Sequence, residues 1–207
     1  MRKEGETGAQ KAARVEGWIA NRVPDVRFLL DHLLDNIAWD SEANLDPASI
    51  GIVGHSFGGW TALAAPEVDG RIRAVVALAP AGSNRPPPNI IPAKLTFTWG
   101  HDVPTLYLVA EDDTALPLAA MYELFERTRA TKRMVVLRRA DHQHFEDEIM
   151  QTAGLCSGEQ AHVFTRGLTL CHLDATFKRQ EEAQRFWSGD VEGELAVRGV
   201  DVIARTS

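Results

Sequence analysis

Short apolar segments alternate with segments of helical periodicity along this chain, and that alternation restricts its fold more than any other feature. Arg73–Ala79 reads RAVVALA and Thr105–Ala110 reads TLYLVA, with apolar side chains at consecutive positions instead of every second one. Consecutive apolar positions are typical of strands buried on both faces of a parallel sheet. Two further short strands are predicted at Ser49–Val53 and Met134–Leu137. The sequence therefore predicts an α/β fold with a mostly parallel sheet and helices on both faces.

The segments around these strands predict helices. Apolar residues recur at helical spacing over Val23–Trp39, and Pro24 lies near the predicted start of this helix, where proline is tolerated. Gly58–Ala65 is a run of small residues that predicts a helix ending near Pro66. Leu118–Arg129 predicts a third helix.

The domain organisation follows from composition along the chain. Residues 1–16 are polar and charged and are predicted to form a flexible segment, and residues 17–207 are predicted to form a single domain. Residues 80–103 are interrupted by prolines and predict a loop. After residue 145 the chain is predicted to be mostly helical, so the fold is expected to consist of about four core strands plus a helical tail.

Charge and hydropathy exclude several classes of partner. The formal net charge is −7 and basic residues form no stripe, so nucleic acid is not an expected partner. No run of 18 apolar residues occurs, so no membrane span is expected. The chain as given lacks a secretory signal and is expected in the cytoplasm, with secretion as the alternative if the natural start lies upstream. Cys156 and Cys171 have no metal-ligand spacing and are expected to be reduced thiols, with a disulfide as the alternative.

A serine stands between glycines where the first predicted strand gives way to a helix. The stretch Gly51–Trp60 reads GIVGHSFGGW and contains a G-x-S-x-G pattern centred on Ser56. In this strand–turn–helix context the serine hydroxyl is exposed in a strained turn, and side chains at Gly54 and Gly58 are expected to clash with backbone. Ser56 is therefore a candidate nucleophile, with the Phe57 N–H as an oxyanion donor. The alternative is a glycine-rich turn with an idle serine.

Acidic residues and histidines follow two of the later strands. Glu111, Asp112 and Asp113 come after TLYLVA, and the D-x-x-L-P spacing favours Asp113 as the acid that orients a histidine, with Asp112 as the alternative and Glu111 third. His142 and His144 follow the last predicted strand, and His142 is favoured as the base because it lies nearer the strand end. The other histidines are predicted to be structural or exposed: His32, His101, His162 and His172.

The candidates occur in the order Ser, Asp, His, each after its own strand, and their surroundings resemble a known superfamily. GIVGHSFGGWTAL, LVAEDDTALP and ADHQHFEDE are similar to segments of α/β hydrolases. GHSFGG and the pattern H-Q-x-F-x-D, which starts at His142, more narrowly resemble dienelactone-hydrolase-like proteins related to the secreted platelet-activating-factor acetylhydrolases. The similarity covers about residues 22–150.

The resemblance implies a serine esterase, lipase-like and without metal or cofactor, with Ser56 as nucleophile, Asp113 as acid and His142 as base. True dienelactone hydrolases use a cysteine nucleophile, so a serine at this position points to ester hydrolysis. The expected substrate is a small-molecule ester with a short acyl chain, cleaved through an acyl-enzyme. Trp60 and Trp99 are expected to pack in the core rather than to contact substrate.

One departure from the family pattern affects these expectations. α/β hydrolases carry several strands before the helix predicted here near residue 22, together with a loop that supplies a second oxyanion N–H, and no HGG or HGF segment occurs in this chain. Losing one oxyanion donor costs on the order of 100–1,000-fold in rate. Either the chain is a fragment, or a second copy covers the open sheet edge by self-association, or a helix folds over it. An inactive fragment, and acyl-transfer, peptidase or thioesterase chemistry on the same residues, are the alternatives.

Overall fold

The structure is a computed structural model that describes residues 5–35, 45–88, 90–146 and 154–206. The chain divides into two compact units, Met1–Pro47 and Ala48–Ser207. This division falls at Pro47 and not at the predicted boundary between residues 16 and 17. None of the helices in the described residues is both long and apolar enough to cross a membrane.

In the described residues of the first unit, Gly8–Asp35 form the helix α1. It begins at Gly8 because Thr7 and Gln10 cap it reciprocally: the Thr7 N–H donates to Oε1 of Gln10 at 2.8 Å, and the Gln10 N–H donates to Oγ1 of Thr7 at 3.2 Å. Residues 8–16, predicted to be flexible, are thus helical. Pro24 lies inside α1 instead of near its start.

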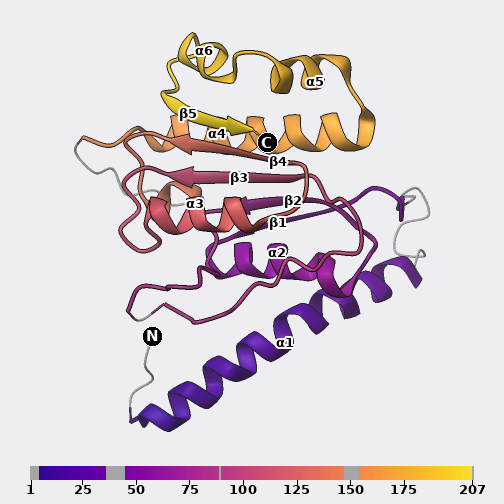
Figure 1. Ribbon diagram of the computed structural model, residues 1–207, viewed down its shortest axis with the longest axis vertical. Helices are drawn as coiled ribbons and strands as arrows, with labels where there is room; N and C mark the ends of the chain where they lie inside the picture. The colour runs from indigo at the N-terminus through magenta and orange to yellow at the C-terminus, as the bar shows by residue number, and fades with distance from the viewer. Residues whose placement is uncertain (1–4, 36–44, 89, 147–153, 207) are drawn as a thin grey trace. The chain divides into compact units, whose positions relative to one another are not determined.

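The second unit is built on a five-stranded sheet in the order β1-β2-β3-β4-β5 (Figure 1). The first four strands run parallel, and β5 is antiparallel to β4. The strands are β1 (Ile50–His55), β2 (Ile72–Leu78), β3 (Thr105–Ala110), β4 (Lys132–Leu137) and β5 (Val202–Thr206). The helices are α2 (Phe57–Val68), α3 (Leu118–Arg127), the 3₁₀ helix η2 (His142–Phe145), α4 (Gly158–Leu173), the π-helical turn η3 (Asp174–Lys178), α5 (Glu181–Ser188) and α6 (Val191–Ala196).

Helices cover both faces of this sheet, as the apolar strands predict. On β3, Tyr107 stacks edge-on against Phe125 of α3, with ring centroids 5.9 Å apart. Leu106 and Leu108 alternate to the other face, where they join a buried cluster with Phe164 of α4. Figure 1 shows α3 in front of the sheet and α4 behind it. Every residue of β3 is buried, which explains why its sequence does not alternate.

The C-terminal part of the chain differs from the helical tail that the sequence predicts. Residues 202–206 form β5, which pairs with β4 in register from Val202 opposite Leu137 to Thr206 opposite Arg133. A five-residue segment is too short for its hydrophobic periodicity to tell a strand from a helix or a coil. The backbone of the neighbouring strand decides its conformation.

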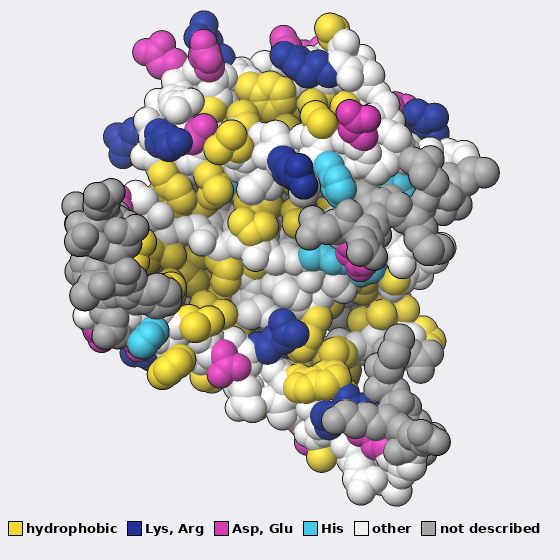
Figure 2. Space-filling model, turned by 180° about the vertical axis from the view of Figure 1, so that it is seen from behind, with side chains coloured by type: hydrophobic (Ala, Val, Ile, Leu, Met, Phe, Trp, Pro, Cys, Tyr) yellow, Lys and Arg dark blue, Asp and Glu magenta, His cyan; other side chains and the backbone are white. Residues whose placement is uncertain are grey.

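The α4 face of the second unit carries apolar side chains at its surface (Figure 2). Val163 and Leu170 are exposed there, at 61% and 57%. A groove of about 310 Å³ lies between α4, α5 and α6 and is lined in part by Cys171. Cys171 and Cys156 are both free, and burial raises the pKa of both thiols.

Candidate active site

Ser56 stands at a sharp turn between β1 and α2. Its backbone has φ 57° and ψ −117°, a conformation that costs a non-glycine residue about 1–3 kcal/mol. Three hydrogen bonds hold this turn: the Ser56 N–H donates to the Leu78 carbonyl at 2.9 Å, and the Ser56 carbonyl accepts from the N–H groups of Trp60 and Ala81 at 3.1 and 2.9 Å. The turn is therefore fixed both to α2 and to the segment after β2.

Two glycines make this turn sterically possible, but only one of them is a glycine of the G-x-S-x-G pattern. A Cβ on Gly54 would lie 2.2 Å from the Gly58 carbonyl oxygen, and a Cβ on Gly59 would lie 2.9 Å from the Pro80 Cα. A Cβ on Gly58 would meet nothing within 4 Å. The predicted clash at Gly58 is wrong, because position 58 faces open space at the start of α2.

Asp113 lies in the turn that follows β3, and both of its carboxylate oxygens are engaged. Oδ1 accepts hydrogen bonds from the N–H groups of Ala115 and Leu116 at 2.9 and 2.7 Å. Oδ2 lies 2.7 Å from Nδ1 of His142. The side chain is only 1% exposed, so backbone donors and one imidazole replace the water that a carboxylate would otherwise bind.

His142 opens the 3₁₀ helix η2 after β4, and its imidazole lies between Asp113 and Ser56. Nε2 is 2.9 Å from Oγ of Ser56, and Nδ1 is 2.7 Å from Oδ2 of Asp113. With the proton assigned to Nδ1, the ring donates to the carboxylate and accepts from the serine hydroxyl. A hydroxyl, an imidazole and a carboxylate are thereby joined in one chain of hydrogen bonds.

The neighbouring candidates point elsewhere. His144 is 1% exposed, and its Nε2 donates to the Cys156 carbonyl at 3.2 Å while its Nδ1 lies against Asp141. Glu111 pairs with Arg138 at 3.4 Å. Asp112 is exposed and makes a backbone hydrogen bond to the Ala140 carbonyl. Of the adjacent acids and histidines, Asp113 and His142 are the two that meet at Ser56.

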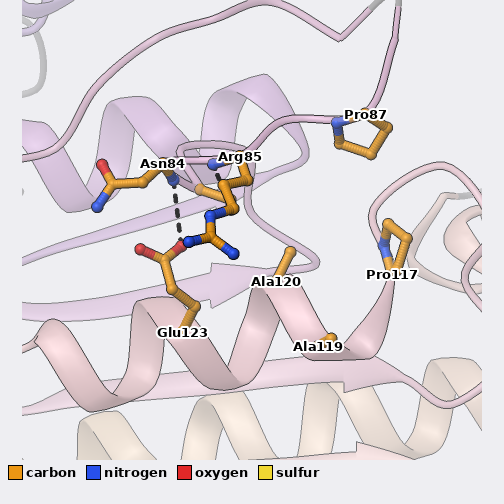
Figure 3. Close-up of a pocket in the computed structure, with 8 residues that line it drawn as sticks. Asn84, Arg85, Pro87, Pro117, Ala119, Ala120 and Glu123 are labelled. Carbon is orange, nitrogen blue, oxygen red and sulfur yellow. Dashed lines mark hydrogen bonds between the residues drawn. The ribbon is translucent and has the colours of Figure 1, made fainter.

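A pocket of about 530 Å³ lies between the segment after β2 and α3, and its lining residues do not include Ser56, Asp113 or His142 (Figure 3). One wall is the segment after β2, and the other is the N-terminal part of α3, which face each other in the figure. Each wall follows, along the chain, a residue that is hydrogen-bonded to the candidate site. The Ala81 N–H donates to the Ser56 carbonyl, and the Leu116 N–H donates to Oδ1 of Asp113. The pocket is lined by Ser83, Asn84, Arg85, Pro87, Pro117, Ala119, Ala120 and Glu123.

The long loop between β2 and β3 is attached to helices by its own side chains and by tryptophans. The Trp60 indole N–H donates to the Lys94 carbonyl at 3.0 Å, and the Trp99 indole N–H donates to the Leu63 carbonyl at 3.2 Å. The Arg127 guanidinium of α3 donates to the Leu95 carbonyl. Both indole groups are thus used in holding the loop against α2.

One residue at this site has no role in the sequence-based prediction. His55, the last residue of β1, donates from Nε2 to the backbone carbonyl of His142 at 3.1 Å. The two imidazole rings lie 4.6 Å apart between centroids. The sequence contained the signal, because His55 directly precedes Ser56 and lies at the same carboxyl edge of the sheet as His142.

Comparison with known protein families agrees with this fold. A family model described as platelet-activating factor acetylhydrolase, isoform II, matches residues 20–157, about two thirds of the chain, and the matched range includes Ser56, Asp113 and His142. No curated protein matches the chain. The match and the mostly parallel sheet together identify a hydrolase of esters with an α/β-hydrolase-type fold. The chain belongs to the family of platelet-activating factor acetylhydrolase, isoform II.

Proposed function

We propose that this chain is a serine esterase that cleaves short-chain carboxylic esters through Ser56, His142 and Asp113. The observation that carries the proposal is the unbroken set of hydrogen bonds from the Ser56 hydroxyl through the His142 imidazole to the buried Asp113 carboxylate, at 2.9 and 2.7 Å. The three groups come from loops after three different strands, and His142 joins the other two by hydrogen bonds.

The reaction follows from this geometry in two stages. Ser56 Oγ attacks the ester carbonyl carbon while its proton moves to Nε2 of His142, and Asp113 stabilises the imidazolium that forms. His142 then gives the proton to the leaving alcohol, and the acyl group remains on Ser56. A water molecule attacks the acyl-enzyme with His142 as base, releasing the carboxylic acid and restoring the serine hydroxyl.

The Phe57 N–H is the proposed donor to the oxyanion. Phe57 directly follows Ser56 and is the first residue of α2, so its N–H lies at the positive end of the helix dipole. Negative charge that develops on the carbonyl oxygen beside Ser56 is stabilised at such a position.

The pocket between residues 83–87 and α3 is the proposed binding site for a short acyl group. Its volume of about 530 Å³ is within the range of small-molecule sites. Part of its lining is apolar, from Pro87, Pro117, Ala119 and Ala120, and the rest is polar, from Ser83, Asn84, Arg85 and Glu123. The name of the family describes removal of an acetyl group, which is the shortest acyl chain of this kind apart from formyl.

The decisive experiment is hydrolysis of p-nitrophenyl acetate and butyrate by the purified chain and by Ser56→Ala. Ser188→Ala, which changes an exposed serine on α5, is the matched control. We expect wild-type rates from the control and only background hydrolysis from Ser56→Ala. A fluorophosphonate probe should label Ser56 in the wild type and give no adduct in Ser56→Ala. Equal rates for wild type and Ser56→Ala would instead support the inactive alternative.

The same assay tests the acyl preference. We expect kcat/KM to fall as the acyl chain of the p-nitrophenyl ester is lengthened from acetate to decanoate. Ala120→Phe places a ring in the pocket and should lower kcat/KM for butyrate more than for acetate. Equal losses for the two esters would place the acyl group elsewhere.

A further inference from the structure

His55 lies against the candidate base without belonging to the hydrogen-bonded set of Ser56, His142 and Asp113. Its Nε2–H donates to the main-chain carbonyl of His142 at 3.1 Å, and its ring lies 4.6 Å from the His142 ring at an interplanar angle of 40°. One side chain therefore contacts both the backbone and the imidazole of the same residue.

The geometry of η2 extends this contact to a second ring. In a 3₁₀ helix the side chains at positions i and i+3 lie on the same side, and His142 and Phe145 have this spacing. The His55 ring contacts both, with 6.0 Å between its centroid and that of Phe145. Phe145 in turn packs against the buried cluster of the α4 face. His55 thus connects the end of β1 to η2 through two ring contacts and one hydrogen bond.

We propose that His55 is a positioning residue: its ring and its Nε2–H hold His142 in line with Ser56. The proposal rests on the proposed function, because the alignment matters for proton transfer between Ser56 Oγ and His142 Nε2. A misplaced base loses much of its effect, since proton transfer needs the two heavy atoms within hydrogen-bond reach.

The charge of His55 is part of this role. Burial, and secondly the neighbouring His142, lower the pKa of His55, although Glu146, the hydrogen bond to the His142 carbonyl and Asp113 act in the opposite direction. A neutral His55 is compatible with the imidazolium that His142 becomes during the reaction. A protonated His55 would place a second positive charge 4.6 Å from that ring and oppose its formation.

Two substitutions separate the hydrogen bond from the ring contact. His55→Gln keeps an N–H donor and removes the titrating group, and His55→Phe keeps an aromatic ring and removes the donor. With p-nitrophenyl butyrate we expect His55→Phe to lower kcat about tenfold, the effect of one lost hydrogen bond, with little change in KM. We expect His55→Gln to restore most of kcat.

The pH profile gives a readout that a purely structural role would not change. In the wild type both His142 and His55 must be unprotonated. Because burial lowers the pKa of His55, the second proton should make the fall in kcat/KM steeper than for one proton only towards the acidic end of the profile. In His55→Gln the acidic limb should report one proton. Thermal unfolding of each variant shows whether the fold is retained.

A measurement that does not need turnover keeps this inference separate from the proposed function. The low-field proton resonance of the His142 Nδ1–H, hydrogen-bonded to Asp113, should be sharp in the wild type and in His55→Gln and broadened in His55→Phe. If the wild type hydrolyses no ester, the proposed function fails and this resonance still tests the positioning. The inference is overturned if His55→Phe matches the wild type in this resonance, in kcat and in the pH profile.

Discussion

Non-glycine residues with positive φ occur within two residues of the ends of three of the parallel strands. Ser56 follows β1 with φ 57°, Ala79 follows β2 with φ 38°, and Arg139 lies two residues after β4 with φ 52°. None of the three is a glycine, so each conformation has a cost that its surroundings must offset. Hydrogen bonds offset this cost at each position. The Ala79 N–H donates to the Leu108 carbonyl, and the Arg139 carbonyl accepts from the Cys156 N–H. Strain of this kind is concentrated at the edge of the sheet that carries the candidate site.

The two glycines of the G-x-S-x-G pattern should respond differently to the same substitution. Gly54→Ala places a Cβ against the Gly58 carbonyl, which is backbone and cannot rotate away, and should cost about 2 kcal/mol or more of stability. Gly58→Ala enters open space in a helix and should be neutral or stabilising by up to about 1 kcal/mol. Urea denaturation of both variants measures this, and equal losses would contradict it.

Adjacent aspartates provide a second matched pair. Asp113→Asn keeps an oxygen for the N–H groups of Ala115 and Leu116, but an amide cannot hold His142 in the required tautomer, so kcat should fall on the order of 10,000-fold. Asp112→Asn changes an exposed side chain and should stay within about twofold of the wild type. Measuring kcat for ester hydrolysis by both variants distinguishes the two aspartates. A larger loss of kcat in Asp112→Asn than in Asp113→Asn would identify Asp112 as the acid.

At the scale of elements, capping interactions and one buried histidine set where the helices lie. α4 begins at Gly158 because Ser157 and Gln160 form the same reciprocal cap that Thr7 and Gln10 form at α1. The C-terminal end of α3 is held by Lys132 of β4, whose ammonium donates to the carbonyls of Phe125 and Thr128 at 2.7 and 2.8 Å. These contacts fix the helices to the strands that carry the site.

The histidine near the end of α4 makes folding sensitive to acid. His172 is fully buried, its Nε2 bonds the Pro104 carbonyl, and its Nδ1 has no hydrogen-bond partner among the described residues. Burial lowers its pKa from 6.5 to about 4. Above pH 6.5 both folded and unfolded chains carry a neutral ring, and below it only the unfolded chain takes up the proton. Stability should therefore fall from pH 6.5 towards 4, by up to about 3 kcal/mol from this group.

Denaturation between pH 7.5 and 4.5 tests this effect in the wild type and in His172→Gln. The Gln variant keeps a donor for the Pro104 carbonyl, which also accepts from Val75, and has no titrating ring. We expect the wild type to lose more stability than His172→Gln over this range. Identical pH dependence would show that His172 is protonated in the folded chain or contributes nothing.

At the scale of the whole molecule, the sheet order determines what can assemble. β1 pairs with β2 and is a terminal strand of the sheet within the residues described, and its Val53 side chain is 46% exposed. Edge strands that are not blocked by charge tend to pair with other chains. Self-association through this edge, expected from the sequence, stays a prediction.

Sedimentation velocity over a range of concentrations measures this association directly. We expect a concentration-dependent dimer whose formation is weakened by Val53→Lys, since lysine on an edge strand opposes pairing. Val197→Lys, which changes an exposed valine after α6, is the matched control and should behave as the wild type. A monomer at every concentration would rule the association out.

The sequence by itself determined the parallel strands and the turn at Ser56, because a buried parallel strand needs consecutive apolar residues and a strained strand-to-helix turn needs glycine at position 54. It also located the two loops whose side chains, Asp113 and His142, are hydrogen-bonded to each other beside Ser56. Spacing favoured Asp113 over Asp112, and position favoured His142 over His144. Only the tertiary structure decided that Asp113 and His142 join Ser56 in one set of hydrogen bonds, because neighbouring side chains point in different directions. The same holds for β5, whose conformation depends on pairing with β4, and for His55, whose contact partner lies 87 residues away.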